Sequence, residues 1–101
     1  MDYDYSIKAD AAELPAKALV AVKKLTGLSP AEIKQGVAAG LPIYGCSAID
    51  DAGLSLIARI HDELAELGVA TSIFWYDRSE PYQNLLTTIR MHREIDAQEY
   101  D

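Results

Sequence analysis

Cysteine is nearly absent from this sequence of 101 residues, which has one, Cys46. A single thiol excludes an internal disulfide framework and a zinc site built from several thiolates. Long apolar runs are also missing: 50% of the residues are hydrophobic, but no run approaches the roughly 20 residues of a membrane-spanning helix. The first residues are acidic, and no long apolar stretch follows them. We therefore expect no secretory signal and a reducing, cytoplasmic location.

Basic charge is scarce as well. The sequence has 9 Lys and Arg residues against 16 Asp and Glu residues, which gives a formal net charge of −7. Because phosphate contacts need clustered Lys and Arg, this balance argues against a nucleic-acid binder and against a protein of anionic membrane surfaces. It favours a protein whose partners are other proteins, above all basic ones.

The usual motifs of catalysis and cofactor binding are missing. The glycines are scattered and match no phosphate-binding loop. Nothing in the spacing connects Cys46 with His61 or His92, so the cysteine pattern indicates a buried strand residue rather than a nucleophile. His61 has no second histidine at metal-ligand spacing, which indicates a histidine at the edge of the core. We expect no cofactor, no metal and no enzymatic activity. A cleft that holds Cys46 beside a histidine would reverse this expectation.

The sequence does contain clear secondary-structure patterns in its first half. Residues 2–10 alternate and predict a half-buried strand whose inner side carries Tyr3, Tyr5, Ile7 and Ala9. A helix is predicted over residues 15–27, with proline at its start and glycine at its end. A short helix over residues 29–40 begins with a capping box, in which Ser29 and Glu32 bond each other's backbone N–H groups.

The second half continues the mixture of strands and helices. Residues 41–46 predict a second strand, and Asp50 or Asp51 caps a third helix that ends at Gly68. The continuous apolar run over residues 69–76 predicts the third strand.

A fourth helix is predicted to start at Ser79-Glu80-Pro81. The order β-α-α-β-α-β-α predicts an α+β two-layer sandwich, in which a small three-stranded antiparallel sheet has helices packed on one face. We divide the chain into an α+β domain over residues 1–76 and a C-terminal helical extension over residues 77–101.

Two segments resemble a known family. Residues 17–37 read K-A-L-V-A-V-K-K-L-T-G-L-S-P-A-E-I-K-Q-G-V, and residues 63–69 read E-L-A-E-L-G-V. They resemble the C-terminal domain of the bacterial large-subunit ribosomal stalk protein, whose fold is shared with the adaptor of Clp proteases. The resemblance covers about residues 3–76 and implies the same fold. It also implies Lys23 and Lys34 as contacts to a translation factor or a chaperone.

Two groups of side chains are candidates for partner binding. The first is a set of carboxylates at the start and on the outer face of the third predicted helix: Asp50, Asp51, Asp62, Glu63 and Glu66. The second is the aromatic pair Phe74 and Tyr76, which alternation places on the open side of the sheet. Two explanations of this pair stay open. The fourth helix covers it with Leu85, Leu86 and Ile89, or the open face binds a partner.

The sequence therefore predicts a small, acidic, non-enzymatic protein-binding module. Its most concrete form is an immunity or antitoxin-type inhibitor that blocks a basic nuclease toxin with carboxylates and aromatic side chains. The alternative is an accessory protein of translation or Clp proteolysis, which recruits a GTPase factor or a chaperone through Lys23 and Lys34.

Overall fold

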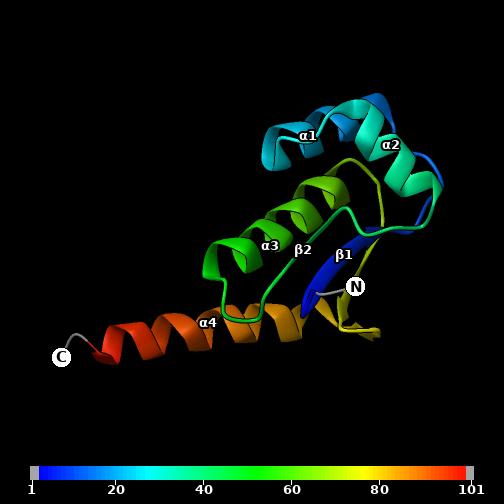
Figure 1. Cartoon of the computed structure of the whole chain (residues 1–101). Helices are drawn as coiled ribbons and strands as arrows, with labels where there is room; N and C mark the ends of the chain where they lie inside the picture. The colour runs from blue at the N-terminus through cyan, green and yellow to red at the C-terminus, as the bar shows by residue number, and fades with distance from the viewer. Residues whose placement is uncertain (1–2, 100–101) are drawn as a thin grey trace.

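The computed structural model describes residues 3–99, with side chains for residues 3–94, and these residues form a sheet layer and a helix layer (Figure 1). Over this range an antiparallel sheet has the strand order β2-β1-β3-β4. The elements are β1 (Tyr5–Ala9), α1 (Ala16–Thr26), α2 (Pro30–Ala38), β2 (Tyr44–Cys46), α3 (Asp51–Glu66), β3 (Thr71–Trp75), β4 (Arg78–Glu80) and α4 (Tyr82–Glu99). The predicted α+β class is confirmed, with a four-stranded sheet instead of a three-stranded one.

The α1–α2 pair forms where local signals in the sequence are strongest. Gly27 ends α1 in the left-handed conformation with φ 78°, which glycine adopts without a Cβ penalty. At the start of α2 the Glu32 N–H donates to Ser29 Oγ at 3.2 Å, and the Ser29 N–H donates to Glu32 Oε1 at 3.4 Å. The predicted capping box is confirmed.

The core lies between the helix layer and one face of the sheet. Ile7 and Ile73, which oppose each other in β1 and β3, point into it. The α3 side chains that pack there are Leu54, Ile57, Ile60 and Leu64, all fully buried. Burial of each such side chain stabilises the fold by about 1.5–3 kcal/mol. Helices α1, α2 and α4 add further side chains to the same core.

The predicted start of the fourth helix at Ser79-Glu80-Pro81 is wrong, because Arg78–Glu80 form β4 and the helix starts only at Tyr82. The chain reverses through a two-residue turn at Tyr76 and Asp77, and β4 then pairs with β3. Pro81 separates the strand from the helix. A three-residue polar strand shows no alternation that could be recognised in the sequence.

The N-terminal strand is also shorter than predicted. Alternation holds from Tyr5 onward, but Tyr3 precedes β1 and lies on the open side of the sheet, away from Tyr5 and Ile7. Its ring rests on Gly45, where any Cβ atom would overlap the ring. Strand β2 covers only the last three residues of the predicted segment, Tyr44–Cys46.

Candidate binding surface

The open face of the sheet is the side that the core does not use. Ser6, Lys8 and Phe74 alternate with the core residues of β1 and β3 and so point to this side. Ser6 opposes both Phe74 and Gly45, and Ser79 of β4 opposes Phe74 from the other edge. These small neighbours leave the Phe74 ring only half-buried.

A hollow of about 590 Å³ lies on this open face. Three aromatic side chains, Tyr3, Phe74 and Tyr76, line it together with the carboxylate of Asp77. The other lining residues are Ser6, Lys8 and Pro42. Lys8 Nζ lies 5.2 Å from the centre of the Phe74 ring, which is cation–π distance. The hollow therefore combines apolar contact area with groups of both charges.

Tyr76 is the most exposed aromatic side chain of the hollow, with 58% of its surface accessible. Its backbone has φ 55°, a conformation that glycine, asparagine and aspartate usually supply in turns. The Tyr76 N–H donates to the Asp4 carbonyl oxygen at 2.7 Å, which holds this conformation. A hydrogen bond to the Asp4 carboxylate, and the charge of that carboxylate, raise the pKa of the Tyr76 phenol.

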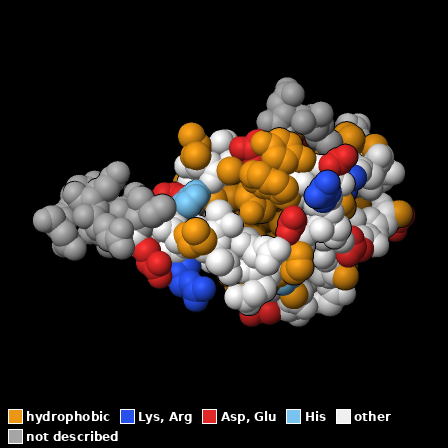
Figure 2. Space-filling view, turned by 90° about the horizontal axis from the view of Figure 1, so that it is seen from below, with side chains coloured by type: hydrophobic (Ala, Val, Ile, Leu, Met, Phe, Trp, Pro, Cys, Tyr) orange, Lys and Arg blue, Asp and Glu red, His pale blue; other side chains and the backbone are white. Residues whose placement is uncertain are grey.

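Aromatic packing connects the hollow to the core. The centres of the Tyr5 and Trp75 rings lie 4.8 Å apart. Those of Trp75 and Tyr76 lie 4.6 Å apart with an interplanar angle of 75°, which is a favourable edge-on geometry. Figure 2 views the lower end of the sheet and α4, and it shows hydrophobic side chains gathered in one patch with acidic side chains at its border. Tyr76 is therefore held in place by packing rather than being a loose surface group.

The predicted carboxylates of α3 are mostly engaged in contacts within the protein. Asp50 Oδ1 accepts from the Gly53 N–H at 2.9 Å and caps the helix. Asp51 Oδ1 lies 2.5 Å from His92 Nδ1 of α4. Asp62 Oδ1 accepts a hydrogen bond from the Tyr82 hydroxyl at 2.8 Å. Glu63 Oε1 lies 3.7 Å from Arg59 Nη2, as an ion pair within the helix. Glu66 is the exposed last residue of α3.

The structure does not bring the two predicted groups together. Helix α3 packs on the core face of the sheet, whereas Phe74 and Tyr76 line the hollow on the open face. The acidic residue that does line this hollow, Asp77, was not singled out from the sequence. The sequence did contain a signal for this residue: aspartate is typical of tight turns, and Asp77 follows directly after the predicted third strand.

Helix α4 does not cover the aromatic pair, so this explanation of Phe74 and Tyr76 is wrong. The helix packs on α3 instead: the Tyr82 ring stacks on His61 at 3.7 Å, and Leu85 is fully buried in the core. The physical reason is β4. It adds a fourth strand at the edge of the sheet, and the chain then passes to the core side of the sheet, where α4 begins.

Cys46 lies buried in β2, as the sequence indicated. Burial, together with the nearby carboxylates of Asp50 and Asp4, raises the pKa of its thiol to about 11. The two histidines bond elsewhere, His61 to Asp62 and His92 to Asp51.

The described residues contain no group of three or more His, Cys, Asp or Glu side chains that could hold a metal ion. Within residues 3–99, no helix combines the length and the apolar character that crossing a bilayer requires.

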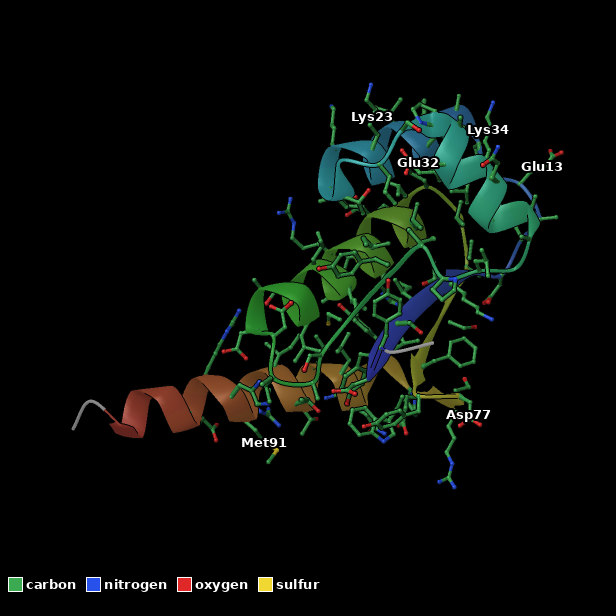
Figure 3. The ribbon with its side chains drawn as sticks, viewed as in Figure 1. Glu13, Lys23, Glu32, Lys34, Asp77 and Met91 are labelled. Atoms are coloured by element: carbon green, nitrogen blue, oxygen red, sulfur yellow. The ribbon has the colours of Figure 1, made fainter. Side chains whose placement is uncertain are left out.

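The lysines implied by the family resemblance lie on the helix pair. Lys23 of α1 and Lys34 of α2 are exposed, and Figure 3 shows both pointing away from the body of the protein. No family model matches the chain, and no curated protein or solved structure matches it either. The resemblance to the stalk domain and the role of the two lysines therefore stay predictions.

Proposed function

We propose that this protein is a non-enzymatic binding module that docks a basic partner protein on the open face of its sheet. The observation that carries the proposal is the uncovered hollow with Tyr3, Phe74 and Tyr76 beside Asp77, on a chain of net charge −7. Exposed aromatic side chains with a polar border are typical of protein interfaces. Tyrosine is among the residues that most often dominate binding energy.

The geometry favours binding because the aromatic groups are already fixed. Phe74 is in the middle of β3 and pairs with β1 on one side and β4 on the other. Tyr76 is held by the backbone bond to Asp4 and by the Trp75 ring. A preorganised surface loses little conformational entropy when the partner binds, so more of the contact energy contributes to affinity.

The most concrete partner is a basic nuclease toxin, which the protein would inhibit as an immunity or antitoxin-type protein. A nuclease groove is positively charged because it binds phosphates, and carboxylates can take the place of those phosphates. The net charge of −7 would also attract such a partner over a distance and speed association.

The test uses the basic proteins encoded beside this gene, each purified and titrated with this protein in a calorimeter. A supported proposal gives one partner that binds and loses nuclease activity when bound. The double variant Phe74→Ser/Tyr76→Ser should weaken this binding at least about 10-fold, because both anchors are lost. The matched control Leu86→Ser removes a part-exposed apolar side chain from α4 and should bind normally. Equal affinity of the double variant and the control would overturn the proposal.

One observation favours the alternative function, recruitment of a translation GTPase or a Clp chaperone. Lys23 and Lys34 are both exposed on the α1–α2 pair, and Glu32, between them in sequence, is engaged in its capping box (Figure 3). If this function is correct, Lys23→Ala/Lys34→Ala should abolish capture of the purified factor. The same variant should leave binding on the open face unchanged.

A further inference from the structure

A second surface of opposite character lies on the helix layer. A groove of about 470 Å³ runs between α3 and α4. Among the residues with described side chains, three of the 9 basic residues of the chain line it, and Asp62 is the one lining carboxylate. The lining residues are Ser55, Ala58, Arg59, Asp62, Tyr82, Leu86, Ile89, Arg90 and Arg93.

The spacing of these residues is that of two helix stripes. On α3 the groove uses positions 55, 58, 59 and 62, and on α4 it uses positions 82, 86, 89, 90 and 93. Steps of three and four residues keep side chains on one face of a helix. Apolar residues and arginines therefore share the same two helix faces. Met91 points away from this face in Figure 3.

Among the lining residues that the structure describes, three arginines face a single carboxylate, that of Asp62. The Asp62 carboxylate already accepts from the Tyr82 hydroxyl at 2.8 Å and lies 3.3 Å from His61 Nδ1. Arg59 has a long contact of 3.7 Å with Glu63. Among the residues with described side chains, no carboxylate lies within ion-pair distance of Arg90 or Arg93.

We propose that the α3–α4 groove binds an acidic amphipathic helix of a partner protein. A helix laid between two neighbouring helices places its apolar stripe against Ala58, Leu86 and Ile89. Glutamate or aspartate side chains at its flanks reach the arginines, whose planar guanidinium groups pair with carboxylates through two parallel hydrogen bonds. This site is independent of the open face, which lies on the other side of the sheet and would take a basic partner.

The probe for the test is a fluorescein-labelled synthetic helix with an apolar stripe at i, i+4 and i+7 and glutamates on either side. We expect the full chain to bind it with a dissociation constant at or below about 100 µM, a typical order for a single short helix in a groove. Arg90→Glu/Arg93→Glu should weaken binding about 10-fold or more, and a lysine version of the probe should restore it to this variant.

The matched control is Lys17→Glu/Arg78→Glu, which changes the net charge equally at exposed residues of α1 and β4. It should bind the probe as the unmodified protein does. Three results would overturn the inference: no binding at millimolar probe, equal loss in both double variants, or equal binding of polyglutamate, which lacks the apolar stripe. Phe74→Ser should not change probe affinity, so this result stands or fails separately from the proposed function.

Discussion

At the scale of single residues, burial controls the reactivity of Cys46. Its thiol pKa is raised to about 11 by burial and then by the charges of Asp50 and Asp4. Only the thiolate reacts with disulfide reagents. We expect Cys46 to react with an aromatic disulfide reagent at pH 7.5 about 100-fold more slowly than an exposed cysteine in a peptide. The rate should reach that of the peptide when the protein is unfolded in guanidinium. A native rate equal to the peptide rate would contradict this.

Tyr82 gives a prediction about pH. Burial and the hydrogen bond to Asp62 raise its pKa from 10.0 to about 12. Between these values the native protein keeps a proton that the unfolded chain has lost, so the free energy of unfolding falls as pH rises. The contribution is fully present below pH 10 and is lost as pH approaches 12. Urea unfolding should show a smaller fall between pH 9 and pH 11.5 for Tyr82→Phe than for the unmodified protein, and equal falls would exclude Tyr82 as a source.

At the scale of elements, α4 is integral to the fold rather than an appendage. Leu85 is fully buried in the core, while its neighbour Leu86 is 37% exposed. Leu85→Ala leaves a cavity and should lower the free energy of unfolding by about 2–4 kcal/mol. Leu86→Ala should cost less than about 1 kcal/mol. Denaturant unfolding measures both, and similar small losses would show that α4 packs loosely.

Sequence periodicity predicted those elements whose own residues carry the signal. The Ser29–Glu32 capping box and the alternation along β3, which placed Phe74 on the open side, depend on residues close together in the chain. Strand β4 could not be predicted, because three polar residues form a strand only when β3 is there to pair with them. The position of Tyr3 could not be predicted either. Its ring packs on Gly45 of the neighbouring strand, and the alternation of its own segment does not show this contact.

The candidate site was predicted in part for the same reason. The carboxylates of α3 could be grouped because they are close together in the sequence. The sequence could not show that the sheet separates them from Phe74 and Tyr76. Nor could it show that α4 would bring Arg90 and Arg93 beside Arg59. The three arginines come together because α4 packs on α3 and on the core through Tyr82 and Leu85.

At the scale of the whole molecule, the two faces differ in what they offer a partner. The open face presents aromatic rings beside Asp77, and the α3–α4 groove presents arginines together with apolar side chains. Because the sheet separates the two surfaces, occupancy of one leaves the other accessible. Under both proposals together, the protein can bind a basic and an acidic partner at the same time.

The net charge of −7 belongs to the molecule as a whole and should appear in the kinetics of association. Long-range attraction speeds encounter with a basic partner and is screened by salt, whereas contacts of Phe74 and Tyr76 act after docking. Stopped-flow measurements should show the association rate constant falling about 10-fold or more between roughly 50 mM and 500 mM salt, with little change in dissociation. Phe74→Ser/Tyr76→Ser should mainly speed dissociation. An association rate that does not change with salt would show that the acidic surface plays no part in binding.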